Sequence, residues 1–266
     1  MNKISIITVV YNDVKHIKST IESVLNQTYS NIEYIIIDGG SLDGTVDLID
    51  NYKLNISYFI SEQDQGIYDA MNKGIRNSTG DWLIFLNSGD LLYNKNTITD
   101  LNNSLTTDAE IVYGDVRVES ETMNLSFKRT AKEISNILNG MVISHQAFVI
   151  KRSLHITNYY DTRYRIAADY NFMLKSFLQG KLFLKVPITI SIISAGGLSD
   201  TNRIASFKEY LTIKNTLNYN YILRNYLHFL KQRLYATFIK GVKLITPKSM
   251  VIRLYKRKYK ISSDEN

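Results

Sequence analysis

Four apolar runs in the first ninety residues, each ending in polar, turn-forming residues, constrain the fold of this chain most strongly. The runs cover 4–10, 32–37, 56–60 and 82–86, and helical apolar spacing occurs at 17–25 and 45–52 with a further segment at 66–75. Strands that alternate with helices predict an α/β fold with a mostly parallel sheet and right-handed crossovers. Parallel strands place their C-terminal loops at one edge, where open α/β sheets bind ligands.

The second half of the chain is less regular. Strand-like runs occur at 111–118, 147–150 and 182–193, and helical spacing occurs at 168–178 and again from about residue 207 onward. Mixed segments of this kind are expected to cover or extend the open edge of the parallel sheet. The nearest feature to a domain boundary is the Gly-rich stretch 195–200.

Charge divides the chain at about the same place. Residues 201–260 hold 14 Lys or Arg and one acidic residue, Glu209, whereas residues 1–200 hold 18 basic and 22 acidic residues. We therefore expect a mildly acidic domain over 1–200 and a basic, mainly helical extension over 201–266. The extension would contact an anionic partner, either a membrane surface or nucleic acid, or another subunit.

The composition excludes several classes of protein. The 266 residues include no cysteine, which excludes disulfides and thiolate metal sites. No apolar stretch reaches the roughly 20 residues that span a bilayer, and the N-terminus does not resemble a signal peptide. The sequence predicts a cytoplasmic protein, either soluble or peripheral on the inner membrane face.

Three acidic residues and a histidine are candidates for chemistry. Asp38 follows a strand beside two glycines, so its carboxylate can accept hydrogen bonds where the backbone permits close approach, although a capping role for this loop is the alternative. Asp90 follows a Ser-Gly turn after the run at 82–86, where one carboxylate plus substrate phosphates suffices for a hard cation, although an ordinary loop aspartate is the alternative. Asp169 opens a helical pattern, where a capping role is the ordinary interpretation, and His145 shows no metal-ligand spacing.

Several motifs together closely resemble family 2 glycosyltransferases. They are Ser5 to Asn12 (SIITVVYN), Ser23 to Tyr29 (SVLNQTY), Ile35 to Thr45 (IIIDGGSLDGT), Ala70 to Ile75 (AMNKGI) and Thr79 to Asp90 (TGDWLIFLNSGD). The resemblance is ordered over residues 3–92 and extends to about residue 200. The run Asp64 to Ala70 and the pair His145-Gln146 also look like a subgroup that acts in bacterial cell-envelope polysaccharide synthesis.

The resemblance implies a Rossmann-like GT-A fold that binds a nucleotide-diphospho-sugar, with UDP as the first expectation and GDP or dTDP as alternatives. By position, it assigns nucleotide-sugar binding to Thr8, Tyr11, Asn12, Asp38, Ser41, Asp43, Glu62, Asp64, Gly66, Lys73, Asn87 and Ser88. It implies that His145, Gly196 and Gly197 close over the donor or the acceptor.

The residues from Asn87 to Asp90 occupy the place of the family's Asp-x-Asp metal motif. Asn87 and Gly89 replace acids of the usual Asp-Ser-Asp-Asp form, so Asp90 is the one carboxylate left for Mn²⁺ or Mg²⁺. Asp169 matches the family's general base, with Ala168 in place of the usual Glu. The implied reaction is a single inverting displacement by an acceptor hydroxyl, which Asp169 deprotonates.

The resemblance implies transfer of a hexose or N-acetylhexosamine to a lipid-linked or oligosaccharide acceptor. A single sugar is expected per reaction, because the Gln-x-x-Arg-Trp signature of processive synthases is missing. Of three other interpretations of the chain, one stays open and two are disfavoured. A non-catalytic sugar-nucleotide or membrane-binding module is the main alternative. A nucleotidyltransferase would need a Gly-rich basic loop after the first strand, and nucleic-acid binding by the basic extension is not expected. The sequence leaves the sugar, the acceptor and the oligomeric state undetermined.

Overall fold

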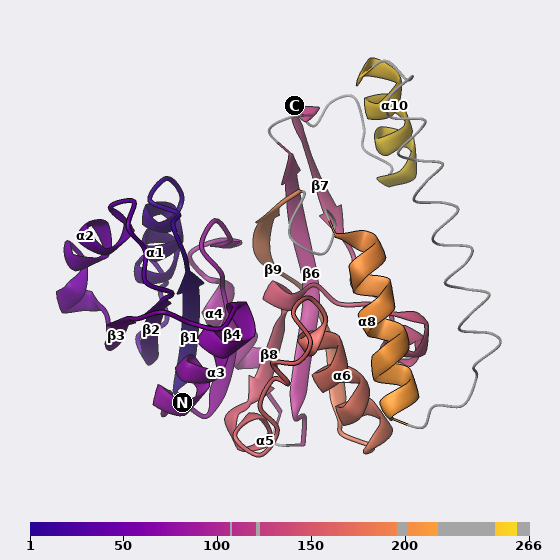
Figure 1. The fold of residues 1–266 in the computed structure, drawn as a ribbon, viewed down its shortest axis with the longest axis horizontal. Helices are drawn as coiled ribbons and strands as arrows, with labels where there is room; N and C mark the ends of the chain where they lie inside the picture. The colour runs from indigo at the N-terminus through magenta and orange to yellow at the C-terminus, as the bar shows by residue number, and fades with distance from the viewer. Residues whose placement is uncertain (107, 121–122, 196–201, 218–247, 260–266) are drawn as a thin grey trace.

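The protein forms a curled, nine-stranded mixed sheet with helices packed around it (Figure 1). The structure is a computed structural model, which describes residues 1–106, 108–120, 123–195, 202–217 and 248–259. The path of neighbouring strands is β3-β2-β1-β4-β8-β6-β9-β5, and β7 pairs with β6 beside this path.

The first half is a parallel sheet with helical crossovers, as the sequence predicts. Its elements are β1 (Ile4–Val10), α1 (Ile17–Leu25), β2 (Ile32–Asp38), α2 (Thr45–Asp50), the 3-10 turn η1 (Lys53–Asn55), β3 (Tyr58–Ser61), α3 (Ile67–Asn77) and β4 (Trp82–Phe85). The strands lie in the order β3-β2-β1-β4, and every pair among them is parallel. The loops that follow these strands therefore meet at one edge.

The second half continues the sheet with mixed pairing. Its elements are β5 (Leu91–Leu92), α4 (Thr97–Ser104), β6 (Ile111–Ser120), β7 (Leu125–Arg129), the 3-10 turns η3 (Ile134–Asn139) and η4 (His145–Ala147), β8 (Phe148–Lys151), α5 (Arg152–His155), α6 (Ala168–Leu178) and β9 (Phe183–Ser194). β8 runs antiparallel to both β4 and β6, whereas β9 runs parallel to β6 and antiparallel to β5. The short strands β5 and β7 were not predicted.

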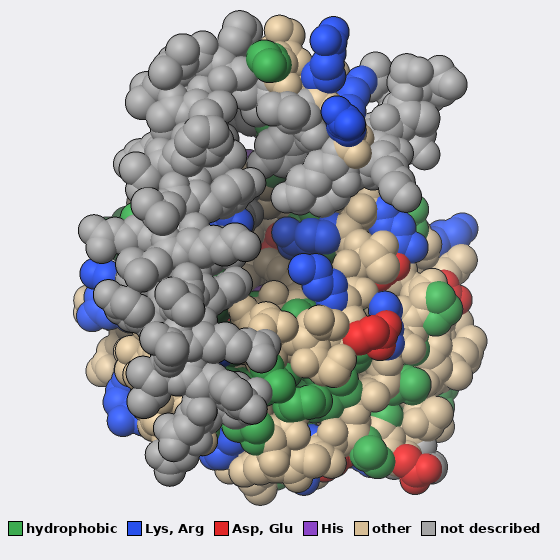
Figure 2. Space-filling model, turned by 90° about the vertical axis from the view of Figure 1, so that its right-hand side faces the viewer, with side chains coloured by type: hydrophobic (Ala, Val, Ile, Leu, Met, Phe, Trp, Pro, Cys, Tyr) green, Lys and Arg blue, Asp and Glu red, His purple; other side chains and the backbone are tan. Residues whose placement is uncertain are grey.

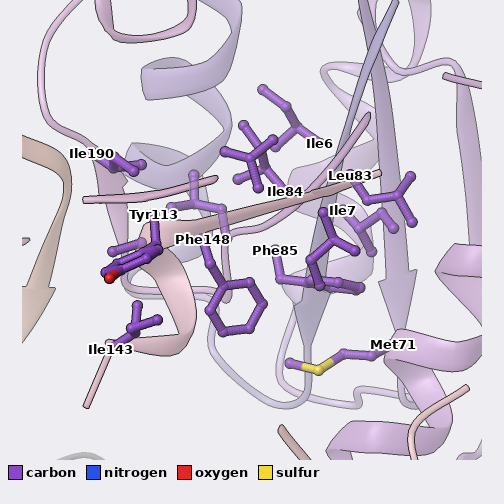
Figure 3. Packing of buried hydrophobic residues seen from close by; sticks show 14 of the residues in the cluster. Ile6, Ile7, Met71, Leu83, Ile84, Phe85, Tyr113, Ile143, Phe148 and Ile190 are labelled. Carbon is purple, nitrogen blue, oxygen red and sulfur yellow. The ribbon is translucent and has the colours of Figure 1, made fainter. Parts of the chain in front are cut away.

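Aliphatic and aromatic side chains from both halves form one continuous core. Figure 3 shows Ile6 and Ile7 of β1 beside Leu83, Ile84 and Phe85 of β4, with Tyr113, Phe148 and Ile190 from the second half on the other side. All eight side chains are almost completely buried. The two halves are therefore one packed unit around the sheet.

Two helices of the C-terminal part are described, α8 (Arg203–Thr216) and α10 (Lys248–Tyr259). α8 packs beside α6, with the rings of Tyr170 and Tyr210 at a centroid distance of 4.3 Å and Ile213 fully buried (Figure 1). Figure 2 views this side of the molecule and shows Lys and Arg side chains near the top, where α10 lies. The helical spacing predicted between 218 and 247 lies outside the described residues, and the division at residue 200 stays a prediction.

Candidate functional site

The loops after β1 and β2 are joined by reciprocal hydrogen bonds. The Asn12 backbone N–H donates to Ser41 Oγ at 2.7 Å, and the Leu42 N–H donates to Asn12 Oδ1 at 2.9 Å. The Val14 N–H donates to Asp43 Oδ2 at 3.0 Å. Asn12 has a φ of 49°, in the left-handed region that asparagine tolerates better than most residues. Asn12, Ser41 and Asp43, three residues predicted to bind the nucleotide, thus all take part in the contacts that join the two loops.

Asp38, the last residue of β2, is the centre of the hydrogen bonds in the loop that follows. Its carboxylate is fully buried and accepts hydrogen bonds from the N–H groups of Gly40 and Ser41 at 3.0 and 2.9 Å. The hydroxyls of Ser41 and Ser61 donate to the same carboxylate at 2.5 and 2.6 Å. In this structure Asp38 therefore holds the loop against β3, and contact with a nucleotide base stays a prediction.

Thr8 is also buried inside the sheet. Its hydroxyl lies 3.1 Å from the hydroxyl of Tyr34, on the neighbouring strand, and its side chain has no exposed surface. The structure therefore places Thr8 below the loop edge, where its hydroxyl packs within the core.

Gly39 separates an aromatic ring from a carboxylate at the loop edge. A Cβ atom at this position would lie 2.5 Å from Asp64 Oδ2 and 3.3 Å from Tyr11 Cδ2. The Tyr11 side chain is 64% exposed, and Asp64 Oδ1 accepts the N–H of Gly66 at 2.8 Å. A bare backbone between an open ring and an acid suits a flat polar ligand that stacks and donates hydrogen bonds.

Lys73 fastens the loop after β3 to helix α3. Its ammonium lies 2.8 Å from Glu62 Oε1 and 3.8 Å from Asp69 Oδ2, and it donates to the carbonyl of Gln63 at 3.1 Å. The predicted pair of Glu62 and Lys73 is thus brought together at the same edge as Asp64, and the lysine charge is already paired.

Asp90 lies in a dry environment at the end of the Asn87–Asp90 turn. It is 8% exposed, and burial raises its pKa to about 7, although a hydrogen bond from Gln146 Nε2 at 2.8 Å opposes this shift. Gly89 has a φ of 89°, and its N–H donates to Thr20 Oγ1 at 3.0 Å. The turn therefore depends on glycine, which explains why an acid cannot easily occupy this position.

The turn supplies oxygen ligands for one divalent cation, but too few to hold it alone. The Oδ1 atom of Asn87 is buried and has no hydrogen-bond partner among the described residues, and the Asp90 carboxylate belongs to the same turn. Within the described part of the chain no three His, Cys, Asp or Glu side chains form a cluster for a metal ion. Amide and carboxylate oxygens fit Mg²⁺ or Mn²⁺ only if substrate phosphates complete the ligand set.

Asp13 is a part of this edge that the sequence reasoning missed. Its carboxylate accepts the Ser88 hydroxyl at 2.6 Å and lies 2.5 Å from His16 Nδ1. Asp13 thereby links the loop after β1 to the turn that follows β4. The available signal was its place directly after Tyr11-Asn12, but local spacing does not reveal the contact with Ser88.

Asp169 stands in the first turn of α6 among aromatic and imidazole groups. Its Oδ1 atom accepts the hydroxyl of Tyr68 at 3.0 Å, and its Oδ2 atom lies 3.5 Å from His145 Nδ1. The Asp169 side chain is 15% exposed. Burial and the nearby Asp169 carboxylate raise the pKa of Tyr68 well above its usual value, so this tyrosine is a neutral donor. The sequence reasoning did not identify Tyr68.

The 3-10 turn η4 connects Asp90 and Asp169, two of the three carboxylates that the sequence singles out for chemistry. Its consecutive residues His145 and Gln146 contact Asp169 and Asp90, respectively. The structure therefore brings Asp90, Asp169 and His145 to one place, next to the loops after β1, β2 and β3. Gly196 and Gly197 lie outside the described residues.

This architecture is that of the GT-A glycosyltransferases, which the solved structures similar to it share. The protein is similar in structure to the mannosyltransferase PcManGT of Pyrobaculum calidifontis, solved in complex with GDP-Man and Mn²⁺. The two superpose with a TM-score of 0.65 and 14% identity, over 98% of this chain and 88% of that chain. This chain is similar to TarS (residues 1–349) of S. aureus in complex with UDP-GlcNAc, with a TM-score of 0.64, 18% identity, and 79% and 64% of the two chains covered. The chain thus spans slightly less than two thirds of that TarS chain.

The chain belongs to glycosyl transferase family 2, whose profile matches residues 5–177. It is 30% identical over 227 residues to a Mycobacterium tuberculosis protein named "PGL/p-HBAD biosynthesis glycosyltransferase", with 82% of this chain and 88% of that protein covered. The predicted family, fold and transferase class are confirmed. No helix in the described ranges has the length and apolar character to span a bilayer.

Proposed function

We propose that the protein transfers one sugar, a hexose or N-acetylhexosamine, from a nucleotide-diphospho-sugar to a hydroxyl of a lipid-linked or oligosaccharide acceptor in cell-envelope glycan synthesis. UDP-sugars are the first candidates for the donor, since the TarS structure holds UDP-GlcNAc. The relative in PGL/p-HBAD biosynthesis supports a glycolipid or glycan acceptor. One observation carries the proposal: η4 contacts both the Asp90 turn and the Asp169 carboxylate.

The donor would lie across the loops after β1, β2 and β3. The exposed ring of Tyr11 and the carboxylate of Asp64 flank the backbone of Gly39, which provides a surface for a base and a ribose. A divalent cation held by Asp90, Asn87 Oδ1 and the diphosphate would supply charge stabilisation for the departing nucleotide. Asp90 is already held in place by Gln146.

Asp169 would take the proton of the attacking acceptor hydroxyl. Tyr68 donates to one oxygen of this carboxylate and the His145 ring faces the other, so the carboxylate has a fixed orientation. A carboxylate fixed in this way suits general-base catalysis, which contributes about 10²–10⁴-fold. The net charge of residues 201–260 supports an acceptor at an anionic membrane surface.

Nucleotide release from a panel of UDP-GlcNAc, UDP-glucose and GDP-mannose, with and without Mn²⁺, tests the proposal. We expect one donor to be hydrolysed slowly with Mn²⁺. Asp169→Asn should lower the rate about 10²-fold or more without changing nucleotide affinity. Asp90→Asn should abolish the effect of the metal, and Asp100→Asn, an exposed acid on α4, serves as the matched control.

Two results would contradict the proposal. Tight binding of a sugar nucleotide without any turnover, in the presence of membrane extracts as acceptor, would favour the non-catalytic binding module. Full activity in Asp169→Asn would remove that residue from the role of base.

A further inference from the structure

Glu209, on helix α8, binds the backbone just ahead of Asp169. Its carboxylate accepts the N–H groups of Arg165, Ile166 and Ala167 at 3.0, 3.0 and 2.8 Å. These three residues immediately precede α6, which begins at Ala168. One side chain thus satisfies three successive N–H groups from a segment about forty residues away in sequence.

This contact is stronger and more specific than a surface ion pair. Hydrogen bonds from backbone N–H groups to a carboxylate are charge-assisted, and an array of three in one geometry fixes the backbone that carries them. Glu209 is also the one acidic residue among the 15 charged residues of 201–260. The basic character of that segment therefore does not explain why an acid stands at this position.

The opposite side of the same backbone is held by Tyr68. The Tyr68 hydroxyl lies 2.9 Å from the carbonyl oxygen of Ile166 and 3.0 Å from Asp169 Oδ1. Ile166 is therefore bound through its N–H by Glu209, and its carbonyl shares the single hydroxyl proton of Tyr68 with Asp169 Oδ1. The connection from α8 to the Asp169 carboxylate passes through Ile166 and Tyr68.

Helix α8 has the packing that such a support needs. The ring of Tyr210, next to Glu209, lies 4.3 Å from the ring of Tyr170, next to Asp169. One turn further along, Ile213 is fully buried. The helix is thus seated on α6 by apolar contacts, and Glu209 transmits this position to the start of α6.

We propose that Glu209 is a positioning residue for the base, which sets the orientation of the Asp169 carboxylate by holding residues 165–167. The inference rests on the proposed function of Asp169. It assigns a catalytic purpose to α8, which lies beyond the residues 5–177 matched by the family profile. The first helix of the basic extension then belongs to the working enzyme.

The test compares Glu209→Gln and Glu209→Ala in the full chain with Thr212→Ala, an exposed position on the same helix. Amide hydrogen exchange of the segment 163–170 is measured together with kcat and KM for nucleotide release, with the affinity for UDP and Mn²⁺ and with the melting temperature. We expect faster exchange in that segment, a kcat about 10- to 100-fold lower and a UDP affinity within twofold of wild type. Thr212→Ala should match wild type in every one of these measurements.

Each other outcome overturns the inference. Unchanged exchange would show that Glu209 does not hold the segment, and faster exchange with unchanged kcat would show that its hold has no catalytic purpose. A parallel loss of kcat, UDP affinity and melting temperature would mean general destabilisation. If wild type and Thr212→Ala release no nucleotide from any donor, the proposed function itself fails, and the exchange data then describe only a contact within the fold.

Discussion

Asp38 ends the parallel strand β2 and Asp90 follows the parallel strand β4, yet their surroundings give the two carboxylates different properties. Asp38 accepts four hydrogen bonds from its own loop and from Ser61, whereas Asp90 receives one from Gln146 in a dry site. A buried carboxylate with few hydrogen-bond donors is costly to ionise, and a bound cation would stabilise its negative charge. These surroundings agree with the proposed metal-binding role of Asp90, whereas the carboxylate of Asp38 is already fully engaged by its loop.

The raised pKa of Asp90 predicts a pH-dependent metal site. Since the pKa is about 7, protons and the cation compete for the carboxylate below neutral pH. We expect the Mn²⁺-dependent part of UDP binding to weaken as the pH falls from 8 to 5.5, by approximately tenfold per unit well below 7. Isothermal titration at four pH values measures this, with Asp90→Asn as the variant that loses the dependence. A flat profile in wild type would contradict it.

At the scale of residues, the sequence predicted positions better than contacts. Asp38, Asp90 and Asp169 lie at strand ends or a helix start, as expected, because these places follow from local apolar patterns. The contacts of Asp90 with Gln146 and of Asp169 with Tyr68 join segments 56 and 101 residues apart. Separations of this size leave no periodic signal in one sequence, so these partners could not be predicted.

At the scale of elements, helix α3 shows how closely the parallel half is packed. α3 lies against β1 and β2, and a Cβ atom at Gly74 would come within 2.4 Å of Ile7 Cγ2. Ile7 is fully buried and β-branched, so its side chain has little freedom to move away. Gly74 thus permits the close approach that brings Lys73 and Tyr68 of the same helix to the site.

Gly74→Ala is expected to destabilise the protein by about 1–3 kcal/mol, because overpacking outweighs the helix propensity of alanine. Urea unfolding measures the change, and Arg76→Ala, at an exposed position of α3, is the control that should unfold close to wild type. A more stable Gly74→Ala variant would show that the sheet accommodates the methyl group.

The elements of the first half could be predicted to within two or three residues at most boundaries, since strands and helices alternate with distinct periods. β5 has two residues, too short for a period to appear, and β7 has five residues with only two buried apolar side chains, Leu125 and Phe127. Pro187 lies within β9, where the register with β6 shifts, and such an irregularity lets a strand contain a proline. The continuous strand through Pro187 therefore depends on tertiary pairing.

At the scale of the whole molecule, a buried aromatic cluster joins the two halves behind Asp169. Its members are Phe85, His145, His155, Tyr160 and Phe172, with ring centroids between 4.4 and 5.9 Å apart in the contacting pairs. His155 is fully buried there, and burial lowers its pKa to about 4. A neutral imidazole is thus part of the core.

The lowered pKa of His155 leads us to expect a loss of stability in acid. Its pKa is about 4 when folded and near 6.5 when unfolded, so the unfolded chain binds the extra proton between these values. We expect the free energy of unfolding to fall as the pH drops from 6.5 to 4, by up to about 3 kcal/mol from this residue. Urea midpoints across that range measure it, and His155→Phe should flatten that part of the curve. An equal slope in wild type and variant would contradict the assignment.

The pairing of β5 with β9 has a consequence for the order in which the protein is made. Leu91 and Leu92, directly after Asp90, pair with Ile192 and Ser191. As the chain leaves the ribosome, β1 to β4 can assemble from neighbouring segments, but the strand beside Asp90 waits for about a hundred further residues. The nascent chain can therefore form the loops after β1, β2 and β3 before the strand pair beside the Asp90 turn, and under the proposed function an unfinished chain would not yet hydrolyse the activated donor.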